Sequence, residues 1–191
     1  DNLKDDMWGY NRYTKQTVNI GSAFLQNEWK NEKWSILLGG RLDKHNLINH
    51  VIFSPRANLR FNPSEDINLR LSYSSGFRAP QAFDEDLHIE NVGGTVSMIE
   101  RAKNLKEEKS QSFSASADMY HRFGAFQVNF LVEGFYTRLS DVFVLENIGE
   151  RDGILIKERR NGSGAKVLGL SMEGKMAYLS LFQLQAGVTL Q

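Results

Sequence analysis

The sequence predicts an all-β protein in which an antiparallel sheet runs up and down. Apolar and polar side chains alternate along seven segments of the chain, and a period of two is that of a strand with one apolar face. Short polar turns join several of these segments, which is typical of hairpins between antiparallel strands. The composition agrees, because 12 Phe and only 3 Pro suit strands better than disorder.

The alternation is clearest after the first thirty residues. For example, Trp34 and Ile36 fall on one side of a strand, and Ser35 and Arg41 fall on the other. Proline donates nothing to a strand ladder, so we expect a bulge at Pro55. The seven predicted strands are 34–43, 51–61, 67–74, 112–119, 126–136, 168–175 and 182–190.

Three further segments give weaker patterns. Residues 1–16 are polar and aromatic without a period, and we expect a loop there. Residues 17–30 indicate a strand, but the pattern does not assign its two faces. Within 139–164, the segments Asp141–Glu146 and Ile154–Glu158 can pair as a hairpin across the two glycines between them.

The lengths of the connections favour a membrane barrel over a soluble β-sandwich. Turns at 30–33, 62–65, 121–124 and 178–180 are short, whereas the connections at 44–50, 75–109 and 139–164 are longer. All short turns therefore fall at one end of the strands and all long loops at the other, as in outer-membrane barrels. A sandwich stays open as the alternative, because alternation alone does not separate a wet lumen from bulk water.

Charged residues in mid-strand indicate that this chain is part of a larger barrel. They lie on the less apolar face, and they are Arg56, Arg60, Arg70, Asp118, Glu133, Glu173 and Lys175. So many inward charges fit a wide, wet or plugged lumen, which needs more than the roughly eight to ten strands found here. We expect residues 1–191 to form a partial barrel domain, with long outside loops near 75–109 and 139–164.

Composition excludes several classes of function. Lys plus Arg and Asp plus Glu each number 23, and a net charge of zero argues against nucleic-acid binding. With no cysteine there is no thiol nucleophile, cysteine zinc site or disulfide framework. No apolar run reaches the ~18 residues of a transmembrane helix. The polar start, DNLKDDMWGY, has no apolar signal region, and the last predicted strand is cut, so we expect a mature or internal fragment.

Six short motifs occur in a fixed order along the chain. They are Ala23–Trp29, Gly39–Asp43, Ser54–Arg56, Tyr73–Pro80, Asn104–Ser110 and Gly164–Leu170. Together they resemble the barrel domain of TonB-dependent outer-membrane receptors. The fifth is similar to that family's NPxLKPExS, although Lys103 and Glu107 stand where proline is usual nearby. The sixth is similar to its A-x-x-x-G-x-E strand, with the acidic position shifted to Glu173.

The resemblance implies a 22-stranded transmembrane β-barrel around an N-terminal plug, of which this chain would be a truncated piece with the plug absent. It implies import of a scarce nutrient, such as a siderophore–iron chelate, haem or cobalamin, across the outer membrane of a Gram-negative bacterium. The implied partners are outer-membrane lipid, the small-molecule nutrient, and the TonB complex acting through the absent plug. No cofactor is implied. Isolated, the fragment would expose two strand edges, which favours an edge-strand dimer.

The stretch SYSSGFRAP, residues 72–80, marks the point where the predicted wall opens into its longest loop. Gly76 and Pro80 shape the turn, and Arg78 can contact a ligand or bridge to a plug carboxylate. A solvated loop is the simpler interpretation for any single residue that follows. The candidate ligand-binding residues are Arg78, Phe83, Asp84, Glu85, Asp86 and His88.

No catalytic or metal site is predicted. His45, His50, His88 and His121 have no metal-ligand spacing, and each is expected in a loop or turn. A Ser-His-Asp arrangement and a phosphate-binding loop are both missing, so we expect no enzyme. Two other functions remain open: the glycan-importing branch of the same family, and a soluble β-rich binding or adhesion module.

Overall fold

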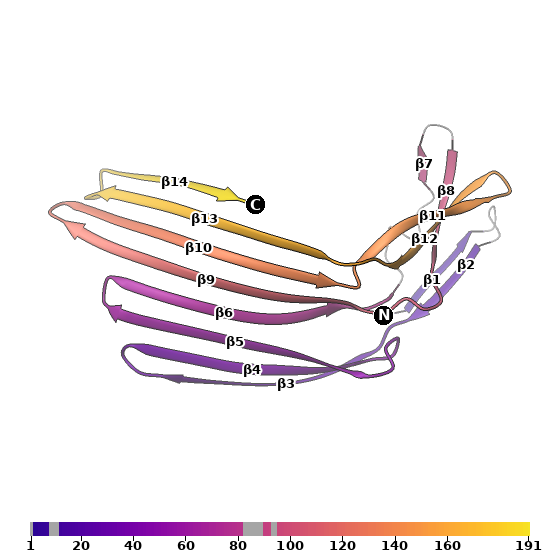
Figure 1. Ribbon diagram of the computed structural model, residues 1–191, viewed down its shortest axis with the longest axis horizontal. Helices are drawn as coiled ribbons and strands as arrows, with labels where there is room; N and C mark the ends of the chain where they lie inside the picture. The colour runs from indigo at the N-terminus through magenta and orange to yellow at the C-terminus, as the bar shows by residue number, and fades with distance from the viewer. Residues whose placement is uncertain (1, 8–11, 82–89, 93–94) are drawn as a thin grey trace.

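The computed structural model of the chain describes residues 2–7, 12–81, 90–92 and 95–191. Every regular element in these residues is a β-strand, which confirms the all-β class (Figure 1). In the described part of the chain, no helix is long and apolar enough to span a membrane.

Eight strands form one antiparallel sheet, which we call the wall. Its order is β14-β13-β10-β9-β6-β5-β4-β3, so neighbours in space are successive wall strands along the chain (Figure 1). The strands are β3 (Ile20–Lys30), β4 (Trp34–His45), β5 (Val51–Ser64), β6 (Ile67–Arg78), β9 (Glu108–Phe123), β10 (Phe126–Ser140), β13 (Ala165–Tyr178) and β14 (Phe182–Leu190). This is the up-and-down arrangement that the sequence predicts.

The two longest connections build a second sheet, which we call the loop sheet. Its strands are β7 (Glu90–Val92), β8 (Thr95–Arg101), β11 (Phe143–Arg151) and β12 (Ile154–Asn161), in the order β11-β12-β8-β7. The predicted hairpin is confirmed as β11–β12, with Glu146 opposite Glu158. A parallel ladder between β8 and β12 joins the two connections into one body, which rises from one end of the wall (Figure 1).

The expectation of a loop over residues 1–16 is wrong. Strands β1 (Asn2–Met7) and β2 (Arg12–Thr17) pair antiparallel as a two-stranded sheet. The hydrogen bonds of a ladder join backbone groups and do not require one apolar face. These two strands therefore pair although their sequence lacks an alternating pattern.

The register confirms one continuous apolar face on the wall. Ile36 lies opposite Leu59, Leu59 opposite Leu71, and Leu71 opposite Ala115, across β4, β5, β6 and β9. Large apolar side chains on this face stay exposed, and Leu71 is 54% exposed. The few buried apolar residues instead lie in or beside the connections: Ile48, Ile52, Ala79, Met98, Ile99 and Ile156. No second sheet covers the apolar face in the described residues, so the β-sandwich alternative is wrong.

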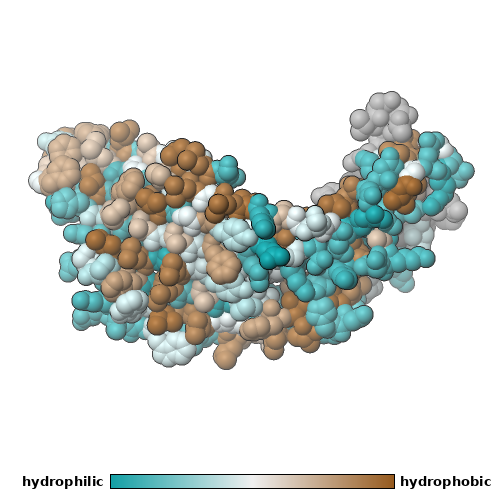
Figure 2. Space-filling view, viewed as in Figure 1, coloured by the Kyte–Doolittle hydropathy of each residue, from teal (hydrophilic) through white to brown (hydrophobic). Residues whose placement is uncertain are grey.

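Figure 2 shows the contrast between the two ends of the molecule. Hydrophobic side chains are spread widely over the wall, whereas the loop sheet is mostly hydrophilic. Aromatic pairs lie on the apolar face at two levels along the strands. Trp34 stacks on Phe61 at 4.0 Å near the short turns. Tyr73 lies 4.7 Å from Phe113 towards the loop sheet, measured between ring centroids.

The structure assigns the faces of β3 that the sequence left open. Leu25 pairs with Gly40 and Trp29 with Ile36, so both belong to the apolar face, and Phe24 lies on the polar face opposite Arg41.

The bulge expected at Pro55 is also wrong. Pro55 keeps register with Gly40 of β4, and the register with β6 starts only one residue later, at Arg56. The missing N–H of Pro55 therefore removes no hydrogen bond from the β5–β6 ladder. The irregularity in β5 lies between Phe61 and Ser64.

Candidate functional site

The candidate site is a cavity of about 650 Å³ on the polar face of the wall, at the end that carries the long connections. Strands β3, β4, β5 and β6 supply its walls. Phe24 brings an aromatic ring from β3, and Arg41, Arg56 and Arg78 bring guanidinium groups from the next three strands. The cavity therefore combines apolar surface with several positive charges.

One of these charges is neutralised inside the wall. The Arg41 guanidinium lies 2.7 Å from Oδ1 of Asp43, and Ser22 Oγ donates to the same oxygen at 2.5 Å. Asp43 is only 1% exposed. A buried carboxylate needs such partners, because burial without them is costly. Arg41 is therefore committed to Asp43 and serves the architecture of the site.

Arg56 is the more available cation, and Arg78 lies where the wall meets the loop sheet. Arg56 is exposed and forms no ion pair with any carboxylate in the described part of the chain. Arg78 ends β6, lies opposite Glu108 in register, and places its guanidinium 5.6 Å from the centre of the Phe143 ring. This contact joins the wall to the start of β11, and so couples the cavity to the loop sheet.

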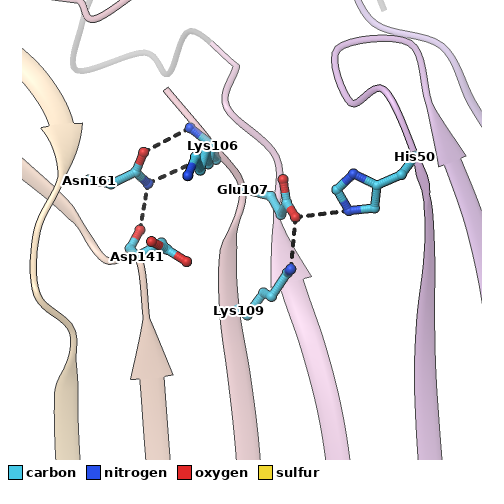
Figure 3. A network of polar contacts seen from close by, with 6 residues as sticks. All are labelled: His50, Lys106, Glu107, Lys109, Asp141 and Asn161. Atoms are coloured by element: carbon cyan, nitrogen blue, oxygen red, sulfur yellow. Dashed lines mark hydrogen bonds and ion pairs between the residues drawn. The ribbon is translucent and has the colours of Figure 1, made fainter. Parts of the chain in front are cut away.

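A buried carboxylate ties two of the connections together (Figure 3). Oε1 of Glu107 lies 3.1 Å from Nε2 of His50 and 3.0 Å from Nζ of Lys109. Burial raises the pKa of Glu107, but its own backbone N–H, the Lys109 ammonium and the His50 ring together outweigh that effect and leave the pKa below its ordinary value. Glu107 is therefore held as a charged link between the β4–β5 connection and β9.

Asn161 makes a second tie, at the end of β12 (Figure 3). Its Oδ1 accepts a hydrogen bond from the backbone N–H of Lys106 at 2.8 Å, and its Nδ2 donates to the carbonyl of Lys106 at 3.1 Å. Nδ2 also donates to the carbonyl of Asp141 at 2.7 Å. A single amide thus satisfies backbone groups on both long connections.

Glu108 holds the same junction from the wall side. Its Oε2 accepts the backbone N–H of Phe143 at 2.9 Å, where β11 begins. Together, Glu107, Glu108 and Asn161 fix the loop sheet to the wall beside the cavity.

The sequence-predicted site residues are only partly placed by the structure. Arg78 lines the cavity. The other five, Phe83, Asp84, Glu85, Asp86 and His88, lie outside the described residues. Sequence reasoning assigned no structural role to Asn161, and it noted Glu107 only as a departure from a proline motif. The charged residue at position 107, where the motif has proline nearby, was the available signal of this contact. A buried charged residue needs partners, whereas proline does not.

The histidines do not form a metal site in the described part of the chain, where no cluster of three potential ligands occurs. Two of them also differ from expectation, because His45 ends β4 and His121 lies within β9 instead of in turns. His45 is buried, and its Nδ1 accepts the backbone N–H of Leu47 at 3.1 Å. It supports the bend after β4.

Several solved structures with a similar arrangement of strands are receptors. The siderophore receptor PirA from Pseudomonas aeruginosa matches 93% of this chain and 36% of its own, at 16% identity and a TM-score of 0.73. The hemophore receptor HasR from Serratia marcescens matches 90% of this chain and 33% of its own, at 14% identity and a TM-score of 0.71. A mutant of the ferric enterobactin receptor PfeA from Pseudomonas aeruginosa matches 94% of this chain and 27% of its own, at 17% identity and a TM-score of 0.69.

At these identities the likeness shows the fold, and the chain spans about a third of the length of such receptors. No functionally curated protein matches this sequence. The model of the family described as "TonB dependent receptor-like, beta-barrel" matches residues 2–190, nearly the whole chain. That family consists of outer-membrane transporters and not of enzymes. The chain therefore belongs to the TonB-dependent receptor family, and it is part of the β-barrel domain.

Proposed function

We propose that this chain is the ligand-facing part of the barrel of an outer-membrane importer that takes up a scarce nutrient with energy from the TonB complex. The nutrient is an iron chelate, haem or cobalamin. The long connections lie on the outside of the cell and the short turns on the periplasmic side. A plug carried elsewhere in the longer protein connects the barrel to TonB.

One observation supports this proposal above the others. The apolar face of the wall is exposed and carries aromatic side chains at two levels along the strands. Ten residues separate Phe126 from Tyr136 on β10, and ten separate Phe113 from Phe123 on β9. At about 3.3 Å per residue and a strand tilt of about 40°, this spacing is about 25 Å, the height of the apolar band of an outer-membrane barrel.

The cavity beside the loop sheet supports uptake of a ligand with both aromatic and anionic parts. Arg56 and Arg78 supply positive charge, and Phe24 supplies an aromatic surface that is 82% exposed. Guanidinium groups bind carboxylates and other planar oxyanions in two-pronged geometry. We propose that Arg78 contacts the ligand together with Phe83, Asp84, Glu85, Asp86 and His88 on the connection that follows β6.

Growth on single nutrient sources tests the function. A strain lacking the receptor gene is supplied with one iron chelate, haem or cobalamin at a time, and is compared with the same strain carrying the gene. We expect the gene to restore growth on one of these sources. Arg78→Ala should then raise the nutrient concentration needed for half-maximal growth about tenfold, a loss of about 1.4 kcal/mol. Restored growth only on a glycan would overturn the proposed substrate class.

A further inference from the structure

The apolar face of the wall carries charge at only one of its ends. In the eight wall strands, all of which the structure describes, the acidic residues lie on the polar face by register: Glu28, Asp43, Glu108, Asp118, Glu133 and Glu173. The basic residues on the apolar face all lie near the strand ends that lead to the long connections: Lys44, Lys109, Arg138 and Lys166. This end of the apolar face therefore carries positive charge and no carboxylate from a wall strand.

Two of these four cations already have partners. Nζ of Lys44 donates to a backbone carbonyl at 3.0 Å, and Nζ of Lys109 lies 3.0 Å from Oε1 of Glu107 (Figure 3). Arg138 and Lys166 are exposed, lie directly opposite each other on β10 and β13, and form no ion pair with any described residue. Like charges in this position repel and weaken a sheet, so an anion between them would stabilise it.

A cavity of about 440 Å³ lies at this end of the wall, beyond the last pair of the β5–β6 ladder. Arg138, Lys109 and His50 line it, together with the polar side chains of Gln111 and Ser140. Guanidinium groups and neutral N–H and O–H donors of this kind bind phosphate oxygens through charge-assisted hydrogen bonds. The cavity is therefore suited to a phosphate group.

An apolar groove of about 710 Å³ lies next to this cavity on the same face, and Tyr73, Phe113, Tyr136 and Leu168 line it. Tyr73 lies opposite Phe113, and Phe113 opposite Tyr136, so the three rings form one row across β6, β9 and β10. A Cβ added at Gly134, which also lines the groove, would meet no heavy atom of another strand within 4 Å. An open apolar groove and a positively charged cavity thus lie side by side along the strands.

We propose that this end of the apolar face binds a lipid of the outer leaflet, with its phosphate headgroup at Arg138 and Lys166 and an acyl chain in the groove. The inference rests on the proposed function, because it takes the apolar face as the lipid-facing side and the long connections as the outside. Aromatic rows lie where the hydrocarbon of a membrane ends, so the residues beyond them meet the headgroups. Arg138 follows Tyr136 by two residues on β10, which is about 7 Å along a strand.

A lipid suits the site better than a free anion does. Its acyl chain gains contact with the groove, and it holds the phosphate at the level of the two cations. Tethering of this kind raises the effective concentration of the phosphate far above that of a dissolved anion.

Lipid titration of the full-length receptor in detergent, read by native mass spectrometry, tests the headgroup site. The probes are dioleoyl phosphatidic acid, dioleoylglycerol, which has the same acyl chains without phosphate, and inorganic phosphate. We expect phosphatidic acid to bind, and Arg138→Gln with Lys166→Gln to raise its Kd about tenfold. The control, Lys33→Gln with Arg122→Gln, removes the same charge near the short turns and should leave the Kd unchanged.

A second pair of variants tests the groove without a change of charge. Gly134→Leu fills the open floor and should raise the Kd of phosphatidic acid about fourfold or more, since each CH₂ that loses its contact is worth about that factor. Gly174→Leu is the matched control. Gly174 lies on the same face, opposite Phe130 and nearer the short turns, and it also has open space around it.

Three results would overturn the proposal. They are an equal Kd of phosphatidic acid for the native receptor and the Arg138 and Lys166 double variant, equal binding of dioleoylglycerol and phosphatidic acid, and displacement of phosphatidic acid by an equal concentration of inorganic phosphate. None of these measurements depends on transport. A receptor that imports its nutrient but gives one of these results refutes this inference alone, and one that binds phosphatidic acid as expected but imports none refutes the proposed function alone.

Discussion

Glu107 gives the junction beside the cavity a dependence on pH. Its pKa lies below the ordinary 4.5, so the folded state holds the charged form better than the unfolded chain does. The stabilisation is therefore complete above 4.5, and it is lost as the pH falls through the lowered value of the folded protein. We expect amide exchange in residues 102–109, corrected for its intrinsic rate, to accelerate in this acidic range.

The variant Glu107→Gln keeps the shape and removes the titration. It should show faster exchange than the native chain at pH 7 and no further acceleration on acidification. Glu65→Gln, in the short turn between β5 and β6, is the matched control, since Glu65 is exposed and lies at the other end of the wall. Equal pH profiles for the native chain and Glu107→Gln would contradict this account.

Asn161 should be the most sensitive residue at the junction. Asn161→Ala removes three hydrogen bonds to the backbone of Lys106 and Asp141. At about 0.5–1.5 kcal/mol for each bond, local opening of the loop sheet should become easier by roughly 1.5–4.5 kcal/mol. Amide exchange of β8 and β12 measures the change. Asn147→Ala, which loses one local bond to Gly149, should change it by less than half as much.

The β11–β12 hairpin is specified by its turn. Asp152 and Gly153 have φ of 54° and 77°, the left-handed pair that a two-residue hairpin turn requires. Gly153→Val places a branched side chain in that region and should destabilise the hairpin by about 1–2 kcal/mol. Asp152→Asn, which tolerates the same region, should leave it unchanged. Amide exchange rates across residues 143–161 measure the stability of the hairpin in both variants. Equal protection in Gly153→Val and Asp152→Asn would contradict the role of the turn.

Elements with local signals were predictable from the sequence. Alternation predicts wall strands such as β5 and β10, and the glycines at 149 and 153 indicate the β11–β12 hairpin. Strand β8 was missed because its pairing with β12 is parallel and joins residues more than fifty positions apart, such as Met98 and Ile156. Such pairing leaves no periodic trace. Strands β1 and β2 were missed because neither has one apolar face.

The candidate site was predictable to a smaller extent. Arg78 was identified by its place at the end of β6, where a strand opens into a long connection. The cavity itself depends on Arg41, Arg56 and Phe24, which come together only through the register of four strands. Of the partners of Glu107, Lys109 is near in sequence on β9, whereas His50 comes from the separate β4–β5 connection. Sequence spacing does not contain these contacts, because they follow from how the sheet pairs.

The wall is built to separate two environments. One face presents exposed Leu, Val and aromatic side chains, and the other presents Arg, Asp, Glu and Ser that bond mostly among themselves. Such a sheet is stable in one piece only if lipid covers the first face and water or polar protein covers the second. The full-length protein should therefore migrate differently on a gel before and after boiling. Unchanged mobility would count against a closed barrel.

Adjacent residues on β10 test this separation directly. Val132 lies on the apolar face opposite Ala117 and Met172, and Leu131 lies on the polar face opposite Asp118 and Glu173. Val132 is also six residues from Phe126 and four from Tyr136 along β10, close to mid-height in the apolar band. Val132→Arg should cost about 2–4 kcal/mol in lipid, because the guanidinium then sits near the bilayer midplane.

Leu131→Arg is the control, since it puts the same side chain one position away beside two carboxylates in a wet interior. Its cost should be smaller by at least 1 kcal/mol, and urea unfolding of the full-length receptor in lipid vesicles measures both variants. The two positions are neighbours on one strand and receive the same side chain, so the difference between the two costs reports the surroundings of each face. Equal costs, or a larger cost for Leu131→Arg, would place water on the apolar face and remove the physical basis of the membrane assignment.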